Sequence, residues 1–218
     1  MPVALPNDSQ RLLIVGATGS GKTQAALWHL SHRTYTSMSW VVYNTKADST
    51  IDSIPYSEQI EIDQVPVKPG VFIVKPLPHE QEALEAHQWE IWKRGSMGVY
   101  VDEGYAMGNH NQAFRALLTQ GRSKYIPMIV LSQRPVWLDR FAFSESEFMQ
   151  AFRLQHAKDR AAMEELIPAP LDRLPAYHSW YYDALGNRTY RMAPVPRLEI
   201  IHATFARRLA PERSRAVV

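Results

Sequence analysis

One short segment, residues 16–23, constrains this chain more than any other part of its sequence. It has the form G-x-x-x-x-G-K-T and consists of Gly16, Ala17, Thr18, Gly19, Ser20, Gly21, Lys22 and Thr23. An apolar run, residues 12–15, precedes the segment, and a helix-like stretch, residues 24–30, follows it. This order of strand, loop and helix is the setting that a phosphate-binding loop requires.

The residue types in this segment have a direct chemical purpose. Glycines let the backbone curl so that successive N–H groups point inward at phosphate oxygens, and the following helix adds the positive end of its dipole. Lys22 can reach the β- and γ-phosphates of a nucleotide, and the hydroxyl of Thr23 can ligate Mg²⁺. A glycine-rich turn with a chance lysine is the alternative interpretation, and the flanking strand and helix favour the phosphate loop over it. The segment therefore predicts nucleotide binding.

Composition narrows the class of protein. The 218 residues are 45% hydrophobic and 21% charged, as expected for a globular protein with one substantial core. The chain has no cysteine, which excludes disulfides and thiolate metal sites. No apolar run approaches the roughly 20 residues that span a bilayer, and no signal-peptide pattern opens the sequence.

Charge gives little guidance about partners. A net charge of +2 is too small to imply a nucleic-acid partner by itself. Arginines do gather near the C-terminus, at positions Arg207, Arg208, Arg213 and Arg215. Such a tail could contact phosphate or an acidic partner, or be a solvated chain end.

The pattern of apolar runs predicts an α/β fold with a mainly parallel central sheet. Strands are expected at residues 11–15, 39–43, 71–75, 98–102 and 128–131, and helices at residues 79–94, 111–120 and 144–156. Residues 178–183 and 189–192 flank a Gly-Asn turn and predict a C-terminal β-hairpin. We expect a single domain, with a core at about 11–160 and the hairpin and basic tail at about 170–218.

Two adjacent acids, Asp102 and Glu103, end the apolar strand that begins at residue 98. Ligands of open α/β sheets bind at the carboxyl ends of the strands, so both acids are expected to face the phosphate loop. Asp102 is placed to hold Mg²⁺ through water, and Glu103 to polarise an attacking water molecule. The alternative interpretation is a buried strand that runs into an acidic turn without a catalytic role.

The next strand ends at Ser132-Gln133-Arg134-Pro135. An amide at this point could contact the γ-phosphate or the attacking water, which makes Gln133 a candidate sensor. An ordinary turn imposed by Pro135 is the alternative interpretation.

Phosphoryl transfer also benefits from an arginine that meets the developing charge, often one supplied by a neighbouring subunit. Arg122, just before the strand at residue 128, is the candidate for this role, and Lys124 extends the same basic edge. Arg115, Arg134 and Arg140 are competitors, since most arginines are solvated or form surface ion pairs.

Taken together, these motifs resemble the FtsK–HerA superfamily of P-loop translocases. More narrowly, they are similar to the small genome-packaging ATPases of tailless, membrane-containing viruses. The resemblance covers about residues 11–135, and its motifs are residues 16–23, Asp102-Glu103, Gly121-Arg122 and Ser132 to Pro135. Asn44-Thr45-Lys46 stands where relatives often have Asp-Pro-Lys, which leaves the role of Lys46 open.

This resemblance implies a RecA-like core that binds ATP and Mg²⁺ and moves along double-stranded DNA. It also implies a homo-oligomeric ring, expected to be a hexamer, in which a neighbour's arginine completes each site. Loops lining the pore would hold the DNA backbone, with Lys93 and Arg94, or residues 105–110, as candidates. A motor of this kind would pump DNA into a preformed capsid, working in the host cytoplasm and at the packaging vertex of the virion, beside capsid-vertex or portal proteins.

Three alternatives remain at this point. A HerA-like cellular or plasmid DNA pump would usually carry membrane anchors or added domains. A small nucleoside or nucleotide kinase shares the phosphate loop but has no need for Glu103 as an activator of water. A scaffold that binds ATP without hydrolysing it would not need the catalytic residues.

Overall fold

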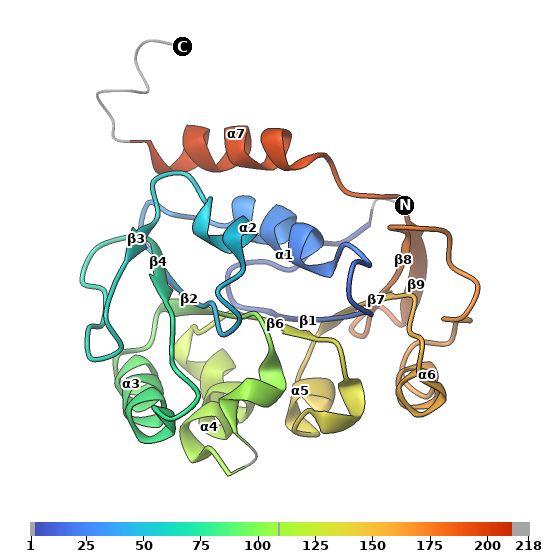
Figure 1. Cartoon of the computed structure of the whole chain (residues 1–218), viewed down its shortest axis with the longest axis horizontal. Coiled ribbons are helices and arrows are strands. Elements are labelled where there is room, and N and C mark those ends of the chain that lie inside the picture. The colour runs from blue at the N-terminus through green and yellow to red at the C-terminus, as the bar shows by residue number, and fades with distance from the viewer. Residues whose placement is uncertain (1–2, 109, 211–218) are drawn as a thin grey trace.

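A mostly parallel β-sheet organises the chain (Figure 1). The computed structural model describes residues 3–108 and 110–210. Within these residues the sheet has nine strands in the order β3-β4-β2-β5-β6-β1-β7-β8-β9. The strands are β1 (Arg11–Val15), β2 (Ser39–Tyr43), β3 (Glu58–Gln59), β4 (Gly70–Val74), β5 (Met97–Val101), β6 (Met128–Ser132), β7 (Phe148–Phe152), β8 (Ser179–Asp183) and β9 (Arg188–Met192).

Strand direction divides the sheet into two parts. All pairs from β3 to β7 are parallel, whereas β8 pairs antiparallel with β7, and β9 antiparallel with β8. The carboxyl ends of β1, β2, β5 and β6 therefore meet at one edge, where the loops that follow them converge. The predicted α/β fold is confirmed, and the predicted C-terminal hairpin is confirmed as a continuation of the same sheet.

Helices cover both faces of the sheet (Figure 1). The α-helices are α1 (Lys22–Ser31), α2 (Ser49–Asp52), α3 (Gln81–Arg94), α4 (Gln112–Gln120), α5 (Phe141–Ser144), α6 (Ala157–Glu164) and α7 (Leu198–Leu209). Short 3₁₀ turns occur at η1 (Gly104–Met107), η2 (Gly121–Lys124) and η3 (Pro135–Trp137). Helices α1, α2 and α7 lie on one face, and α3, α4 and α5 on the other.

The buried core consequently has two layers, one on each face of the sheet. In β1, Leu13 and Val15 pack toward the layer that includes α3 and α4, and Leu12 and Ile14 toward the layer that includes α1 and α7. Side chains of a strand alternate between its faces, so a strand covered on both faces must be apolar throughout. This explains the continuous apolar runs in the sequence.

The prediction of a helix over residues 144–156 is wrong. The chain instead leaves α5 and forms β7, which pairs with β1. Phe148 and Phe152 pack on the α1 side of the sheet, while Met149 and Ala151 pack on the opposite side. Periodicity does not distinguish a strand buried on both faces from a buried helical segment.

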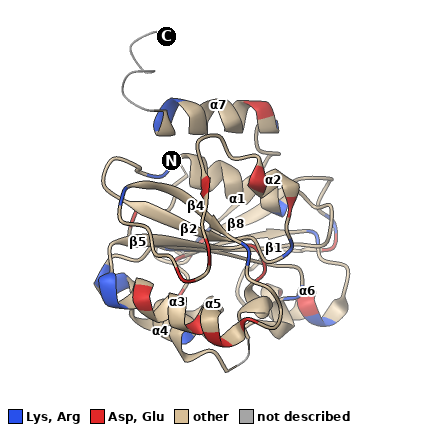
Figure 2. Cartoon of the chain, turned by 60° about the vertical axis from the view of Figure 1, so that its left-hand side comes forward, with Lys and Arg blue, Asp and Glu red and all other residues tan. Residues whose placement is uncertain are grey.

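Helix α7 was not predicted from the sequence. It packs beside α1, with Ile201 and Phe205 buried against the sheet. Its first turn contains Glu199 and its last turn Arg207 and Arg208, which complement the helix dipole (Figure 2). The rest of the predicted basic tail, Arg213 and Arg215, lies outside the described residues.

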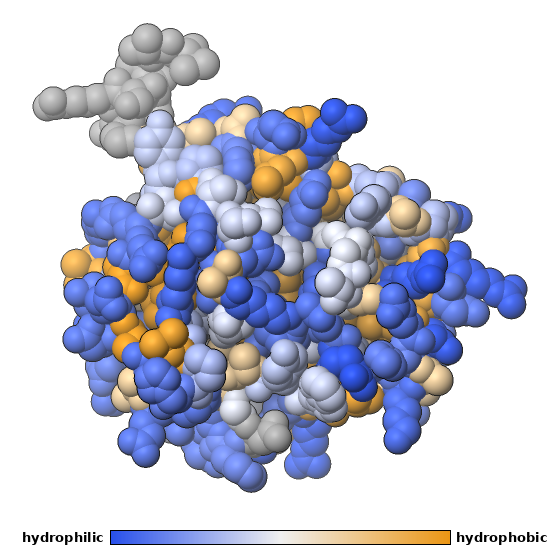
Figure 3. Space-filling view, in the orientation of Figure 1, coloured by the Kyte–Doolittle hydropathy of each residue, from blue (hydrophilic) through white to orange (hydrophobic). Residues whose placement is uncertain are grey.

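Hydrophobic surface is broken into separate patches among polar side chains on the face shown in Figure 3. No helix in the described part of the chain has the length and apolar character needed to cross a bilayer.

Candidate functional site

The phosphate-loop motif, Gly16 to Thr23, connects β1 to α1 at the carboxyl edge of the sheet. A Cβ atom at Gly16 would lie 2.5 Å from Ser20 Oγ and 2.7 Å from Phe152 Cβ, so only glycine fits there. Gly21 precedes α1 with φ 95°, a left-handed conformation. Because Gly21 brings no capping side chain, the first N–H groups of α1 remain available to an anion.

Lys22 lies in the first turn of α1, and its side chain is buried. Burial lowers its pKa, and the nearby Lys46 lowers it further, while Glu103 and Asp102 act in the opposite direction. A lysine held among charged groups beneath an anion-binding loop is suited to pairing with phosphate.

Asp102 and Glu103 follow β5 and lie buried at the same edge of the sheet. Burial raises the pKa of Asp102 to about 6; Asp48 and Glu103 also raise it, and Lys46 and Lys22 lower it. Its Oδ2 atom is buried without a hydrogen-bond partner in the described structure. A buried carboxylate oxygen of this kind is unfavourable unless a ligand or water satisfies it.

Glu103 is fixed by two contacts. Its side chain is 0% exposed, and its Oε2 lies 2.5 Å from Lys46 Nζ. Its Oε1 accepts a hydrogen bond of 3.0 Å from the backbone N–H of Gln133. Together these contacts hold the carboxylate between the loops that follow β2 and β6.

Gln133 is connected to the phosphate loop. The hydroxyl of Thr18 donates a hydrogen bond of 2.9 Å to Oε1 of Gln133. The residue predicted as a sensor therefore contacts Thr18 through its side chain and Glu103 through its backbone.

The donor set at this edge fits Mg²⁺. Mg²⁺ favours oxygen ligands and is commonly held by one or two carboxylates together with substrate phosphates and water. Asp102 Oδ2, Ser20 Oγ and Thr45 Oγ1 are buried oxygens that lack a hydrogen-bond partner among the described residues. The predicted ligands Thr23 and Asp102 stand at the start of α1 and the end of β5. No cluster of three or more His, Cys, Asp or Glu side chains suited to a metal occurs in the part of the chain described.

Sequence reasoning left the role of Lys46 open, and the structure places it in the site. Lys46 follows β2, whose carboxyl end lies at the same edge as those of β1 and β5. Asp48, two residues later, also acts on the pKa of Asp102 and of Lys22. The position of Lys46 in the sequence could have indicated this, because Lys46 lies in the loop that follows a predicted parallel strand.

The structure does not bring Arg122 to this edge. Arg122 belongs to η2, which precedes β6, so it lies at the amino end of the sheet. The five residues of β6 separate the two edges by roughly 16 Å at about 3.3 Å per residue. The Arg122 side chain is 67% exposed, with its guanidinium 3.9 Å from Glu147.

Two of the three competing arginines form closer ion pairs within the chain, whereas Arg140 lies over the Phe141 ring, 5.3 Å from its centroid. Arg134 Nε lies 2.8 Å from Asp159, and its guanidinium also stacks over Trp137. Arg115 Nε lies 2.5 Å from Asp139.

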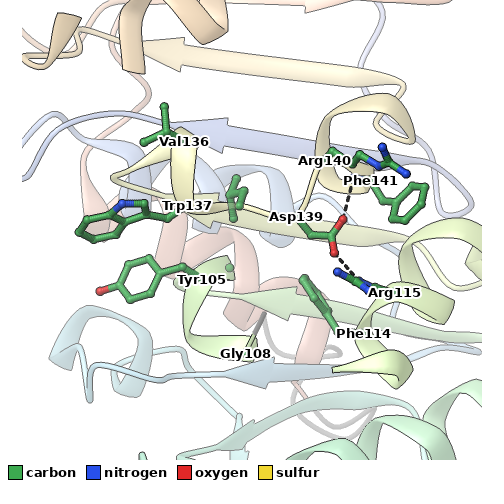
Figure 4. A pocket seen from close by; sticks show the side chains of 11 residues that line it. Tyr105, Gly108, Phe114, Arg115, Val136, Trp137, Asp139, Arg140 and Phe141 are labelled. Atoms are coloured by element: carbon green, nitrogen blue, oxygen red, sulfur yellow. Dashed lines mark hydrogen bonds and ion pairs between the residues drawn. The ribbon is translucent and has the colours of Figure 1, made fainter. Parts of the chain in front are cut away.

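The loops that continue from Glu103 and Gln133 border an open hollow of about 860 Å³ (Figure 4). Tyr105 and Trp137 stand at its rim with their rings edge to face, 5.5 Å between centroids. Asp139 lies across the hollow and binds Arg115. These loops link the two catalytic candidates directly to exposed aromatic and basic side chains.

Comparison with known proteins identifies a relative over nearly the whole chain. The DNA packaging ATPase P9 of Enterobacteria phage PRD1 is 47% identical over 218 residues, covering 94% of this chain and 96% of P9. No protein-family model matches the chain.

Solved structures share the fold at low sequence identity. The genome packaging NTPase B204 of Sulfolobus turreted icosahedral virus 2, in complex with AMPPCP, superposes with a TM-score of 0.67 at 18% identity, covering 87% of this chain and 100% of B204. The cytoplasmic domain of the type VII secretion ATPase EccC of Thermomonospora curvata superposes with a TM-score of 0.62 at 15% identity, covering 94% of this chain and 28% of EccC. The predicted P-loop ATPase fold and the resemblance to viral genome-packaging ATPases are confirmed.

Proposed function

This chain belongs to the family of viral DNA packaging ATPases that includes P9 of phage PRD1, and from that membership we propose that it hydrolyses ATP to drive double-stranded DNA into a preformed capsid. One observation supports this most: Lys22 at the start of α1, the adjacent acids Asp102 and Glu103 after β5, and Gln133 after β6 meet at one edge of the sheet. Such a set serves hydrolysis of a bound nucleoside triphosphate.

We assign roles to these residues as follows. The N–H groups of the phosphate loop and Lys22 hold the β- and γ-phosphates and stabilise the charge that develops on them. Mg²⁺, held by Thr23 and Asp102, would neutralise phosphate charge when bound. Glu103 accepts a proton from the attacking water, and Gln133 orients the water or the terminal phosphate.

Hydrolysis is favoured over transfer to another hydroxyl. A kinase needs no carboxylate to activate water, whereas Glu103 is buried beside the phosphate loop and held by Lys46 and the Gln133 N–H. Water is therefore the acceptor that this geometry serves best.

We further propose that the active form is a homo-oligomeric ring, a hexamer, in which Arg122 acts on the nucleotide of the adjacent subunit. Two facts support this: Arg122 is highly exposed, and it lies at the sheet edge opposite its own phosphate loop. An arginine so placed lies away from its own phosphate loop and is accessible to a neighbouring subunit.

DNA would contact the loops that continue from the catalytic residues. Tyr105 and His110 are exposed and lie in the segment between β5 and α4 that begins with Asp102 and Glu103, so their position can respond to events at Glu103. Lys93 is a weaker candidate because it pairs with Glu90, and Arg94 because it binds backbone carbonyls. Backbone contacts of this kind carry no sequence information and are salt-dependent. The motor would act in the host cytoplasm and at the packaging vertex, beside capsid-vertex or portal proteins.

The test is ATP turnover of the full chain with and without linear double-stranded DNA, alongside phosphoryl transfer to a panel of nucleosides. The proposal expects turnover that DNA stimulates and that Lys22→Ala abolishes. Transfer to a nucleoside without stimulation by DNA would instead identify a kinase.

A further inference from the structure

A turn from the C-terminal third of the chain lies beside the phosphate loop. Residues 174–178 lead into β8 and border a hollow of about 200 Å³. The other wall of the hollow is the phosphate loop itself, residues 17–20, and Arg153 and Gln155 complete its lining. The hollow is smaller than the roughly 300–1,000 Å³ of a pocket for a whole ligand, so it suits one planar ring system.

Tyr177 is the prominent side chain of this turn. It is 58% exposed although it is aromatic. A Cβ atom at Gly21 would lie 3.1 Å from Cδ1 of Tyr177, so the ring reaches the start of α1. This is the end of the phosphate loop from which a bound nucleotide would extend toward its base.

The turn is held in an unusual conformation. Tyr177 has φ 60°, in the left-handed region that non-glycine residues seldom adopt. Hydrogen bonds from the His178 N–H to Pro175 O at 3.1 Å, and between His178 Nδ1 and Ala176 O at 3.0 Å, close the turn. Leu174 is buried in the core and anchors it. A strained backbone that presents an exposed ring beside a ligand loop is typical of a functional position.

We propose that this turn is the nucleobase site of the ATPase, with the Tyr177 ring stacking on the base of the nucleoside triphosphate. Arg153, Gln155 and His178 supply polar groups to the edge of the base or to the ribose. The antiparallel hairpin then has a defined purpose, because β8 pairs with β7 and so sets the position of the turn relative to the phosphate loop. This inference rests on the proposed function, since it supplies the base half of the same nucleotide site.

The experiment compares two ligands by calorimetry in the presence of Mg²⁺: ATP, and inorganic tripolyphosphate, which has no base. Wild type is compared with Tyr177→Asn, Tyr177→Phe and the control Tyr56→Asn. Asparagine tolerates the left-handed region, so Tyr177→Asn removes the ring without adding backbone strain. Tyr56 is a matched control because it also has positive φ, 59°, and is 55% exposed.

Tyr177→Asn should weaken ATP binding on the order of tenfold, because stacking between a base and an aromatic ring contributes that much or more. Its affinity for tripolyphosphate should stay at the wild-type value, and Tyr177→Phe and Tyr56→Asn should bind both ligands normally. Unchanged ATP affinity in Tyr177→Asn overturns the inference. So does an equal loss for both ligands, which would mean that Tyr177 shapes the phosphate loop.

Two further results distinguish the base site at Tyr177 from the proposed motor function. Tyr177→Asn could lose affinity for ATP but not for tripolyphosphate while wild type shows no DNA-stimulated turnover. This result would support the base site and contradict the motor function. If Tyr177→Asn changes the oligomeric state but not ATP affinity, the turn is a subunit contact and the base site is wrong.

Discussion

Lys46 Nζ lies 2.5 Å from Oε2 of Glu103, a carboxylate that is 0% exposed. The two residues follow different strands, β2 and β5, that are neighbours in the sheet. The Lys46 side chain itself is 35% exposed, so it bridges the buried carboxylate and the open edge where phosphate would bind. Lys46 is therefore a positioning residue for Glu103.

The first prediction concerns Lys46→Met. We expect kcat to fall on the order of a hundredfold, comparable to the loss of a general base, because Glu103 loses the partner that orients it. KM for ATP should change much less. Steady-state ATPase assays separate the two effects. Lys75→Met is the matched control, since Lys75 pairs with Asp52 at 2.8 Å and its side chain is 32% exposed. This control should retain the wild-type kcat. Equal losses of kcat in both variants would contradict the role assigned to Lys46.

Glu103→Gln should retain ATP while failing to hydrolyse it. Glutamine has the same size and can still accept the hydrogen bond from the Gln133 N–H, but it cannot take a proton from water. We expect kcat to fall by about 10²–10⁴ and ATP affinity, measured by calorimetry, to stay within a few-fold of wild type. Substantial turnover in this variant would remove Glu103 from the mechanism.

Arg122→Ala should leave ATP binding intact and abolish turnover in the assembled ring. The sharper measurement mixes this variant with Glu103→Gln. A site made of an Arg122→Ala subunit beside a Glu103→Gln subunit has an intact acid and a neighbour's intact arginine, so the mixture should regain activity that neither variant shows alone.

Mixing Glu103→Gln with Lys22→Ala is the control for complementation. Both substitutions disable a subunit's own site, so neither neighbour can restore it. If Arg122→Ala turns over ATP normally, the arginine that completes the site is another one, and Arg134 is the next to test.

Acid should destabilise the fold through His29. Burial lowers the pKa of this side chain from 6.5 to about 3, so below pH 6.5 the unfolded chain binds a proton that the folded chain does not. The contribution of His29 to the free energy of unfolding should therefore decrease as the pH is lowered from 6.5 to 3, by up to about 1.4 kcal/mol per pH unit. Asp102, whose pKa is raised to about 6, acts in the opposite direction below pH 6, because the folded chain then holds a proton that the unfolded chain lacks.

Denaturant unfolding from pH 7 to 5 measures this slope. His29→Gln should make the slope shallower, whatever its effect on stability at pH 7. His79→Gln provides the control, because it removes a histidine that is exposed rather than buried, and its slope should stay closer to wild type than that of His29→Gln. Part of the slope should remain in both variants, since burial also lowers the pKa of His87, to about 4.

Local sequence was sufficient for the parallel sheet and for the phosphate loop. The strands β1, β2 and β6 were predicted to within one residue of their bounds, because each is an apolar run next to a recognisable loop. The acids Asp102 and Glu103 were placed at a strand end, and they lie there. The exceptions include β7, whose run of residues fits a buried helix equally well. The short elements β3, α2 and α5 and the helices α6 and α7 were not predicted.

Other features depended on which strands became neighbours. Nothing near Lys46 in the sequence indicates Glu103, because their pairing follows from β2 lying beside β5. The same holds for Tyr177, which reaches Gly21 only because β8 pairs with β7 and β7 with β1.

By itself the sequence predicted the chemistry of this protein: a loop for phosphate, an acid proposed to hold a metal and an acid proposed to activate water. Each of these features is a short segment of sequence, and the local backbone geometry of that segment sets where its side chains lie. The tertiary structure alone decided which charges stand together and which edge of the sheet each arginine occupies. The physical reason is that strand order sets those distances, and strand order comes from how apolar faces pack, a property of the whole chain.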